Sequence, residues 1–306
     1  MTKPSVALTG ASGFIGHHLL RVLLARGYDV RALLRQSGSL PPGAAGVVVG
    51  DLRAPRDLAS ALAGIDVVVH AAGLAHQPRG VGDAEMFATN ATATLELAKA
   101  AQKQGVRRFV FVSSLRAQTG PSAPHRLAET TPPNPTDAYG RAKLAAERGL
   151  AGLDIEWAAL RPVLVYGRGA QGNLASLLRL ARLPLPLPFG AFEAPRSLVG
   201  VDSVVAAVVA AIEAPGILRR PFLVADTLPV SLADIITALR RGLGRPPNLL
   251  AVSPRVLRAM MQALGRGDMA QRLLEPLEVD ATALTTLGWQ PTADPRPGLE
   301  RWARHP

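Results

Sequence analysis

Short apolar runs alternate with longer segments of helical periodicity along the first half of the chain. Val6–Thr9, Val30–Leu34 and Val67–His70 are largely apolar runs of strand length, which indicate strands buried on both faces. Gly13–Arg26 and Ala84–Gln104 instead repeat apolar residues at the spacing of a helix. The other predicted strands are 47–49, 109–112 and 155–160, and the other predicted helices are 56–63 and 139–150. This alternation predicts an α/β fold, a doubly wound sheet of parallel strands with helices on both faces.

The pattern loosens beyond Arg161. Prolines at positions 184, 186, 188 and 195 exclude a continuous helix in that stretch. We expect residues 1–170 to form a Rossmann domain, with residues 197–225 returning to it as a helix and a strand. Residues 171–196 and 226–306 are expected to form a smaller, loop-rich C-terminal cap.

The composition supports a folded protein with an aliphatic core. The 306 residues are 48% hydrophobic but only 4% aromatic, and they include no cysteine, which excludes thiolate catalysis and disulfide scaffolds. The net charge of +11 comes from 30 Arg and four Lys dispersed along the chain, so we expect small anionic ligands and no nucleic acid. The longest apolar run, Val204–Ile212, is too short to span a bilayer, and the histidines lack metal-ligand spacing. A cytoplasmic protein without a membrane span or a metal is expected.

A glycine-rich turn separates the first predicted strand from the first predicted helix. Its glycines permit a tight turn, a close backbone approach to a pyrophosphate and close packing of the helix, whose N-terminus faces the anion. A merely structural turn is the alternative, but the position between strand and helix favours dinucleotide binding. The expected cofactor-binding residues in this turn are Gly10, Ser12, Gly13, Phe14, Ile15 and Gly16.

The residues after the next strands bear on which dinucleotide is bound. No acidic residue ends the second strand, and Arg35 lies just past it, where it can meet a 2′-phosphate unless it is simply solvated. NADP(H) is therefore favoured, and NAD(H) is possible. Asp51 and Leu52 follow the third strand, where a carboxylate can accept from the adenine amino group. Ala71, Ala72 and Gly73 follow the fourth strand and let the backbone pass close to the cofactor.

Three side chains suit proton transfer beside such a cofactor. Tyr139 and Lys143 are four residues apart on a predicted helix, and Ser114 follows the strand that precedes it. We expect a neighbouring ammonium and a cationic nicotinamide to lower the pKa of the phenol toward working pH. The spacing alone is common, and a helix with a surface lysine is the alternative interpretation.

In this context the sequence resembles the extended short-chain dehydrogenase/reductase family. The matching segments occur in order over nearly the whole chain: 9–16, 50–52, 70–73, 90–94, 111–114, 139–143 and 160–167. The resemblance implies that Ser114 orients the substrate oxygen, Tyr139 is the acid/base and Lys143 holds the nicotinamide ribose. It also implies cofactor contacts for Asn90, Ser113, Pro162 and Val163.

The later segments 172–178, 196–202 and 287–291, with Asp280, resemble enzymes of nucleotide sugars, above all 4-ketoreductases and 4-epimerases of UDP-N-acetylhexosamines. This likeness implies that the cap binds substrate, with contacts from Arg116, Asn173, Leu174 and Arg196 as well as Ser114 and Tyr139. It implies reduction of a UDP-4-keto-6-deoxy-hexosamine with Tyr139 as proton donor. The alternatives are a UDP-sugar 4-epimerase, a reductase of an uncharged ketone, or a non-catalytic dinucleotide sensor.

Two further expectations follow from the resemblance. Sugar-nucleotide 4,6-dehydratases carry an Asp-Glu pair directly after the active hydroxyl residue, whereas Leu115 and Arg116 stand here, so elimination of water is not expected. A homodimer through helices 84–104 and 139–150 is typical of the family. The apolar stripe of Val256–Leu264, which includes Met260 and Met261, is expected to be core, and the alternatives are that it lines a lid or contacts a partner.

Overall fold

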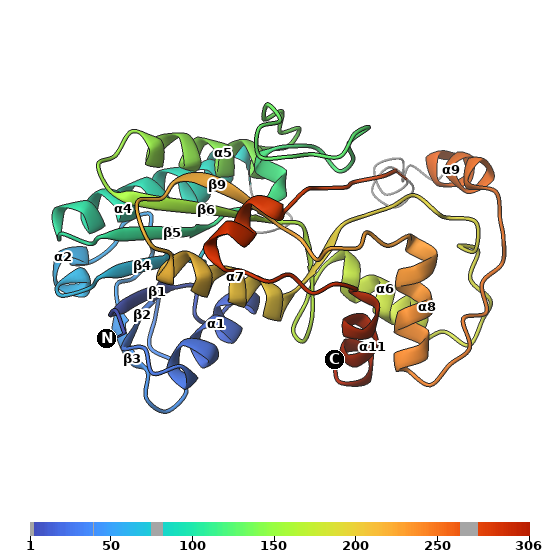
Figure 1. Cartoon of the computed structure of the whole chain (residues 1–306), viewed down its shortest axis with the longest axis horizontal. Helices are drawn as coiled ribbons and strands as arrows, with labels where there is room; N and C mark the ends of the chain where they lie inside the picture. Colours follow the sequence, from blue (N-terminus) through green and yellow to red (C-terminus); the bar gives the residue numbers. More distant parts are fainter. Residues whose placement is uncertain (1–2, 39, 75–81, 264–274) are drawn as a thin grey trace.

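Seven parallel strands form one sheet in the order β3-β2-β1-β4-β5-β6-β9 (Figure 1). The computed structural model describes residues 3–38, 40–74, 82–263 and 275–306. The strands are β1 Val6–Thr9, β2 Val30–Leu34, β3 Ala45–Val48, β4 Val67–His70, β5 Arg108–Val112, β6 Glu156–Pro162 and β9 Arg219–Val224. The order reverses between β1 and β4, and ligands of such sheets bind at the carboxyl ends of the strands beside this reversal. The α/β doubly wound fold predicted from the sequence is confirmed.

Helices cover both faces of the sheet. The helices α1 (Phe14–Ala25) and α7 (Val201–Glu213) pack on one face, whereas α2 (Leu58–Leu62), α4 (Ala93–Lys103) and α5 (Ala138–Ala151) pack on the other. The helix predicted over residues 84–104 is not uniform. It consists of α3 (Asp83–Phe87), a π-helical turn (Ala88–Thr92) and α4, and such turns are frequent at functional sites.

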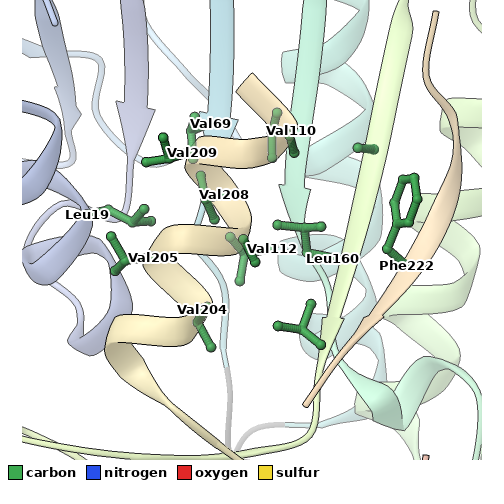
Figure 2. Packing of buried hydrophobic residues seen from close by; sticks show 14 of the residues in the cluster. Leu19, Val69, Val110, Val112, Leu160, Val204, Val205, Val208, Val209 and Phe222 are labelled. Carbon is green, nitrogen blue, oxygen red and sulfur yellow. The ribbon is translucent and has the colours of Figure 1, made fainter. Parts of the chain in front are cut away.

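The core under α7 is built from branched aliphatic side chains (Figure 2). Val204, Val205, Val208 and Val209 of this helix are at most 2% exposed and pack with residues such as Val110 of β5. Burying each such side chain contributes roughly 1.5–3 kcal/mol to stability. The helix α7 therefore stabilises the main sheet, although it follows the first expected cap segment, residues 171–196, in the sequence.

A second buried cluster lies beside the sheet, and its helices are α6 (Asn173–Ala181), α8 (Leu232–Gly242) and α11 (Arg296–Arg304). The strand pair β7 (Leu164–Tyr166) and β8 (Leu198–Gly200) contributes Tyr166 and Leu198 to it. The remaining elements are α9 (Pro254–Ala263) and the 3₁₀ turns 115–117 and 282–287, whose Leu115 and Leu284 pack in the core of the sheet. We propose the domain division expected from the sequence, with residues 1–170 and 197–225 in the Rossmann domain and residues 171–196 and 226–306 in the cap. The expectation of a core stripe on 256–264 is wrong for Val256, which is 53% exposed, and Leu264 lies outside the described residues.

A buried carboxylate joins the two parts. Asp226 accepts hydrogen bonds from the Tyr166 hydroxyl at 3.0 Å, the Gly200 amide at 3.0 Å and the Ser203 hydroxyl at 2.9 Å. Burial raises the pKa of Asp226, although these donors act in the opposite direction. The group therefore ties β7, the start of α7 and the end of β9 together. None of the described helices is long and apolar enough to cross a membrane.

Candidate active site

The glycine-rich turn packs tightly against the loop that follows β4. Gly10 has φ +73°, and a Cβ there would lie 2.6 Å from the Ala72 amide nitrogen. A Cβ on Gly16 would lie 1.9 Å from the Gly10 carbonyl oxygen. Gly13 is the N-cap of α1, and no side chain caps this helix, so its first amides are available to an anion. This cradle, which any side chain would fill, fits a dinucleotide pyrophosphate.

A buried histidine lies beneath the turn. The Thr94 hydroxyl donates to the Asn90 carbonyl at 2.9 Å, so it must accept from Nε2–H of His70, also at 2.9 Å. Nδ1 of His70 is therefore unprotonated and accepts from the Thr9 hydroxyl at 2.7 Å. Burial, with Lys143 nearby, lowers the pKa of His70 to about 3. A neutral imidazole thus joins β1, β4 and the start of α4.

This histidine is expected to make stability fall on mild acidification. The folded state keeps His70 neutral down to about pH 3, whereas the unfolded chain binds a proton below its usual pKa of about 6.5. Stability is therefore lost as pH falls through this window, by about 2 kcal/mol from this group between pH 7 and pH 5. Urea unfolding at both pH values measures the loss, which His70→Gln should remove. An equal pH dependence in His70→Gln and in the exposed-site control His305→Gln would refute the assignment.

Asn90 fixes the next part of this loop. Its Oδ1 accepts from the Leu74 amide at 3.0 Å, and its Nδ2 donates to the Leu74 carbonyl at 3.1 Å. A Cβ on Gly73 would approach this Oδ1 to 2.5 Å and Nζ of Lys143 to 3.4 Å. The structure therefore places Asn90 behind the loop that faces Lys143, and its contact with a cofactor remains a prediction.

The structure brings Ser114, Tyr139 and Lys143 together at the carboxyl end of β5. A hydrogen bond joins Ser114 to Tyr139, and Nζ of Lys143 lies 5.9 Å from the centre of the tyrosine ring. The ammonium donates to the Val112 carbonyl at 3.0 Å and lies 4.5 Å from the centre of the Phe111 ring. Burial lowers the pKa of Lys143 to about 8, although the charge of Glu147 acts to raise it.

The lowering of the Tyr139 pKa by an ammonium and a cationic nicotinamide together remains a prediction. Removal from water raises the pKa of Tyr139 to about 12, and Asp137 adds to this, while Ser114 and Arg116 act to lower it. The Lys143 ammonium, 5.9 Å from the centre of the tyrosine ring, is directed to the Val112 carbonyl. At neutral pH Tyr139 is therefore a protonated donor.

A close backbone contact sets the position of these hydroxyl groups. A Cβ on Gly140 would lie 2.1 Å from the Arg116 carbonyl oxygen, so α5 approaches the turn after Ser114 as only glycine allows. Arg116 also forms an ion pair with Asp137, the N-cap residue of α5, whose carboxylate accepts from the Gly140 amide at 2.8 Å. Leu115 is buried, so no carboxylate directly follows Ser114.

A buried ionic network lies behind the three groups. The Glu147 carboxylate accepts from the Ser113 hydroxyl at 2.5 Å and from Nε of Arg161 at 3.1 Å. Nη1 of Arg161 donates to Gln118 at 2.9 Å. Ser113, Gln118, Glu147 and Arg161 are each at most 3% exposed. The network connects the end of β5, the helix of Lys143 and the strand that ends at Pro162, and both Pro162 and Val163 are buried as well.

The predicted adenosine end is rich in arginine. Arg35 is exposed just past β2, and its charge helps to lower the pKa of Asp51. The larger effect comes from Arg53, which donates to both carboxylate oxygens of Asp51, and the pKa of that group falls to about 2. Arg53 also pairs with Glu85 at 3.0 Å. Sequence reasoning missed Arg53.

The residues predicted to hold the substrate phosphates lie on different parts of the cap. Asn173 is exposed at the first position of α6, while Leu174 is fully buried. The Arg196 guanidinium donates to the Pro121 carbonyl at 3.0 Å and to the Glu275 carbonyl. Burial lowers the pKa of Arg196 to about 10. In this structure Arg196 therefore joins two loops, and its contact with a substrate remains a prediction.

A pyrophosphate cradle beside a Ser, Tyr and Lys set defines a nicotinamide-dependent enzyme of the extended short-chain dehydrogenase/reductase class. The chain belongs to the NAD dependent epimerase/dehydratase family, whose model matches residues 6–221.

Full-length relatives and a solved structure resemble this chain. The UDP-glucose 4-epimerase of Vibrio cholerae is 33% identical over 98% of this chain and 94% of that protein. A 3-diazoavenalumate denitrifying reductase of Streptomyces sp is 34% identical over 94% of this chain and 96% of that protein. The structure of MoeE5 with UDP-glucose and NAD superposes with a TM-score of 0.76 at 27% identity, covering 98% of this chain and 97% of that one.

Proposed function

We propose that this enzyme transfers hydride at carbon 4 of a UDP-linked sugar, reducing a 4-keto-6-deoxy-hexosamine. The observation that carries the proposal is the placement of Ser114, Tyr139 and Lys143 beside the cofactor cradle with no carboxylate after Ser114. The UDP-glucose in the MoeE5 structure and the full-length Vibrio relative support a UDP-sugar. The name of the Streptomyces relative, a 3-diazoavenalumate denitrifying reductase, supports a reductive reaction.

Each side chain has a separate task in this reaction. Pro162 and Val163 would lie beside the nicotinamide, which would supply the hydride. Tyr139, protonated at neutral pH, donates its phenolic proton to the ketone oxygen, and Ser114 orients that oxygen by a hydrogen bond. Lys143 holds the nicotinamide ribose and brings a positive charge that favours the phenolate left after proton transfer. Asn173 and Arg196 bind the diphosphate.

A UDP-sugar 4-epimerase is the second candidate. The name of the Vibrio relative favours it, and the same tyrosine would then remove and return a proton at the oxygen of carbon 4. We further propose a homodimer through α3, α4 and α5, where Phe87 is 45% exposed.

A panel of UDP- and dTDP-sugars, followed by nicotinamide absorbance and product analysis, tests the proposal. A reductase oxidises one added cofactor per sugar reduced, whereas an epimerase interconverts two sugars without net change in cofactor. Competition by free UDP is expected in either case. Turnover of an uncharged ketone with no inhibition by UDP would overturn the nucleotide-sugar proposal.

Arg35 is expected to select NADP(H) over NAD(H). Its exposed guanidinium has no ion-pair partner in the described ranges and lies past β2, where its charge can attract a 2′-phosphate. A charge-assisted hydrogen bond contributes about 1.5–3 kcal/mol, so Arg35→Ala should weaken NADPH binding roughly 10- to 100-fold and leave NADH binding unchanged. Fluorescence titration measures both affinities.

Arg26→Ala provides the matched control, because this exposed arginine lies at the opposite end of α1 from the glycine-rich turn. Equal affinities of the wild-type enzyme for NADPH and NADH would show that Arg35 is merely solvated.

A further inference from the structure

Two loops at the end of the cap remote from the sheet are held together by the backbone. They comprise residues 182–190 and 245–250, and Figure 1 shows them beside α8. The Leu187 amide donates to the Asn248 carbonyl at 3.1 Å, and the Leu250 amide donates to the Leu187 carbonyl at 2.8 Å. We call this pair of loops the cap tip.

A buried arginine of α8 holds the two loops of the cap tip by hydrogen bonds. Arg240 of α8 is 2% exposed and donates to the carbonyls of Leu183, Leu185, Pro247 and Asn248, at 2.6–3.1 Å. One guanidinium thus holds both loops at two points each. The conformation of the cap tip is therefore set by internal hydrogen bonds.

Three large apolar side chains of the cap tip are exposed to solvent. Leu183, Leu185 and Leu250 are 43%, 60% and 52% exposed, and the hydrogen bonds of their own loops keep them there. Prolines 184 and 186 flank Leu185 and further limit the backbone. A group of exposed leucines on a fixed support is typical of a surface that contacts another apolar phase.

The two segments that contain the cap tip carry positive charge only. Residues 171–192 and 235–263 contain seven arginines and no Asp or Glu. Arg240 is used internally and Arg258 lies 3.8 Å from Glu275, whereas Arg179, Arg182, Arg241 and Arg245 are exposed and form no ion pair within the part of the chain that the structure describes. Asp234, the nearest carboxylate on α8, lies at its other end. The cap tip is therefore rimmed by unneutralised positive charge.

A basic pocket adjoins the cap tip. It is a shallow hollow of about 380 Å³, open to solvent, between α6 and α11, and Arg168, Arg179, Arg182 and Trp302 line it. Arg182 also begins the loop that carries Leu183 and Leu185, so pocket and leucines lie next to each other in the chain. Guanidinium groups bind phosphate oxygens in a bidentate manner, which suits the pocket to a phosphate group.

We propose that the cap tip docks on an anionic phospholipid surface, with its leucines in the interfacial region and a lipid phosphate in the arginine pocket. Apolar side chains that enter the headgroup region and a basic rim that faces anionic lipid are the two components of peripheral membrane binding. Complementary charge favours this occupant over a second copy of the equally basic chain. The docking holds whatever sugar the enzyme reduces, since it uses none of the groups at Tyr139.

Sedimentation of the full-length protein with vesicles tests the docking. Binding is expected to vesicles of phosphatidylcholine containing about one-third phosphatidylglycerol, to be weak on phosphatidylcholine alone, and to fall as salt rises. Leu185→Ser with Leu250→Ser should lower the bound fraction at least about tenfold, and Arg179→Glu with Arg182→Glu should do so equally. Ile217→Ser is the matched control, because Ile217 is 74% exposed just before β9 in the sheet domain and should not matter.

Three results would overturn the proposal. One is the absence of binding to the anionic vesicles. The second is an equal loss in Ile217→Ser, which would indicate nonspecific adsorption. The third is a change of oligomeric state in the leucine double variant with vesicle binding unchanged, which would make the cap tip a contact between copies of the chain. Circular dichroism of each variant confirms that the fold is retained.

Discussion

Tyr139→Phe is expected to lower turnover by ~10²–10⁴-fold while leaving cofactor affinity close to that of the wild type. The substitution keeps the ring beside Lys143 and removes only the hydroxyl that gives its proton to the substrate oxygen. Steady-state kinetics on the substrate identified by the panel, with a separate cofactor titration, measure the two effects.

Tyr28→Phe is the matched control for this experiment. Its hydroxyl donates to Glu213 at 2.5 Å, away from Ser114 and Lys143, so its loss should affect stability but not turnover. Wild-type turnover in Tyr139→Phe would exclude Tyr139 as the proton donor.

Glu147→Ala is expected to destabilise the protein by about 3–5 kcal/mol, because it leaves the Arg161 guanidinium buried without its partner. Both residues are 3% exposed, and the carboxylate also accepts from Ser113. Turnover should fall as well, since the network supports the helix of Lys143 and the residue before Ser114. Urea unfolding and kinetics measure the two losses.

An exposed ion pair provides the comparison. Asp154 pairs with Arg219 at 2.7 Å with both side chains largely in solvent, so Asp154→Ala should change stability by no more than ~0.5 kcal/mol. The double variant Glu147→Ala with Arg161→Leu should recover part of the lost stability, because it also removes the unpaired charge. A Glu147→Ala protein as stable as Asp154→Ala would contradict the importance of the network.

Much of the fold was predictable because it depends on patterns that are local in sequence. Continuous apolar runs gave the central strands, and the spacing of glycines gave a turn in which Gly10 and Gly16 allow no side chain. Tyr139 and Lys143 were predictable as neighbours, since four residues make about one helical turn. The NAD dependent epimerase/dehydratase match confirms the resemblance that these motifs indicated.

The features that sequence reasoning missed depend on contacts between distant segments. Glu147 and Arg161 form an ion pair only because α5 packs beside β6. No pattern in the sequence near either residue predicts a buried pair. Gly140 was visible as a glycine inside a predicted helix, which indicates close packing at that position. Only the fold shows that the packing partner is the Arg116 carbonyl. The burial that raises the pKa of Tyr139 also depends on the fold, because the sequence does not show which segments cover the phenol.

Because α7 and β9 come late in the sequence, they leave the ribosome well after the strands on which they pack. The strands β1 to β6 are synthesised first, but the helix that covers Val110 and the strand that pairs with β6 emerge only after α6 and the proline-rich loop. A nascent chain that ends near residue 195 would expose the part of one apolar face of the sheet that α7 later covers, together with a free edge of β6. We therefore expect chaperones to engage this protein during translation, over an interval whose length is set by the first cap segment.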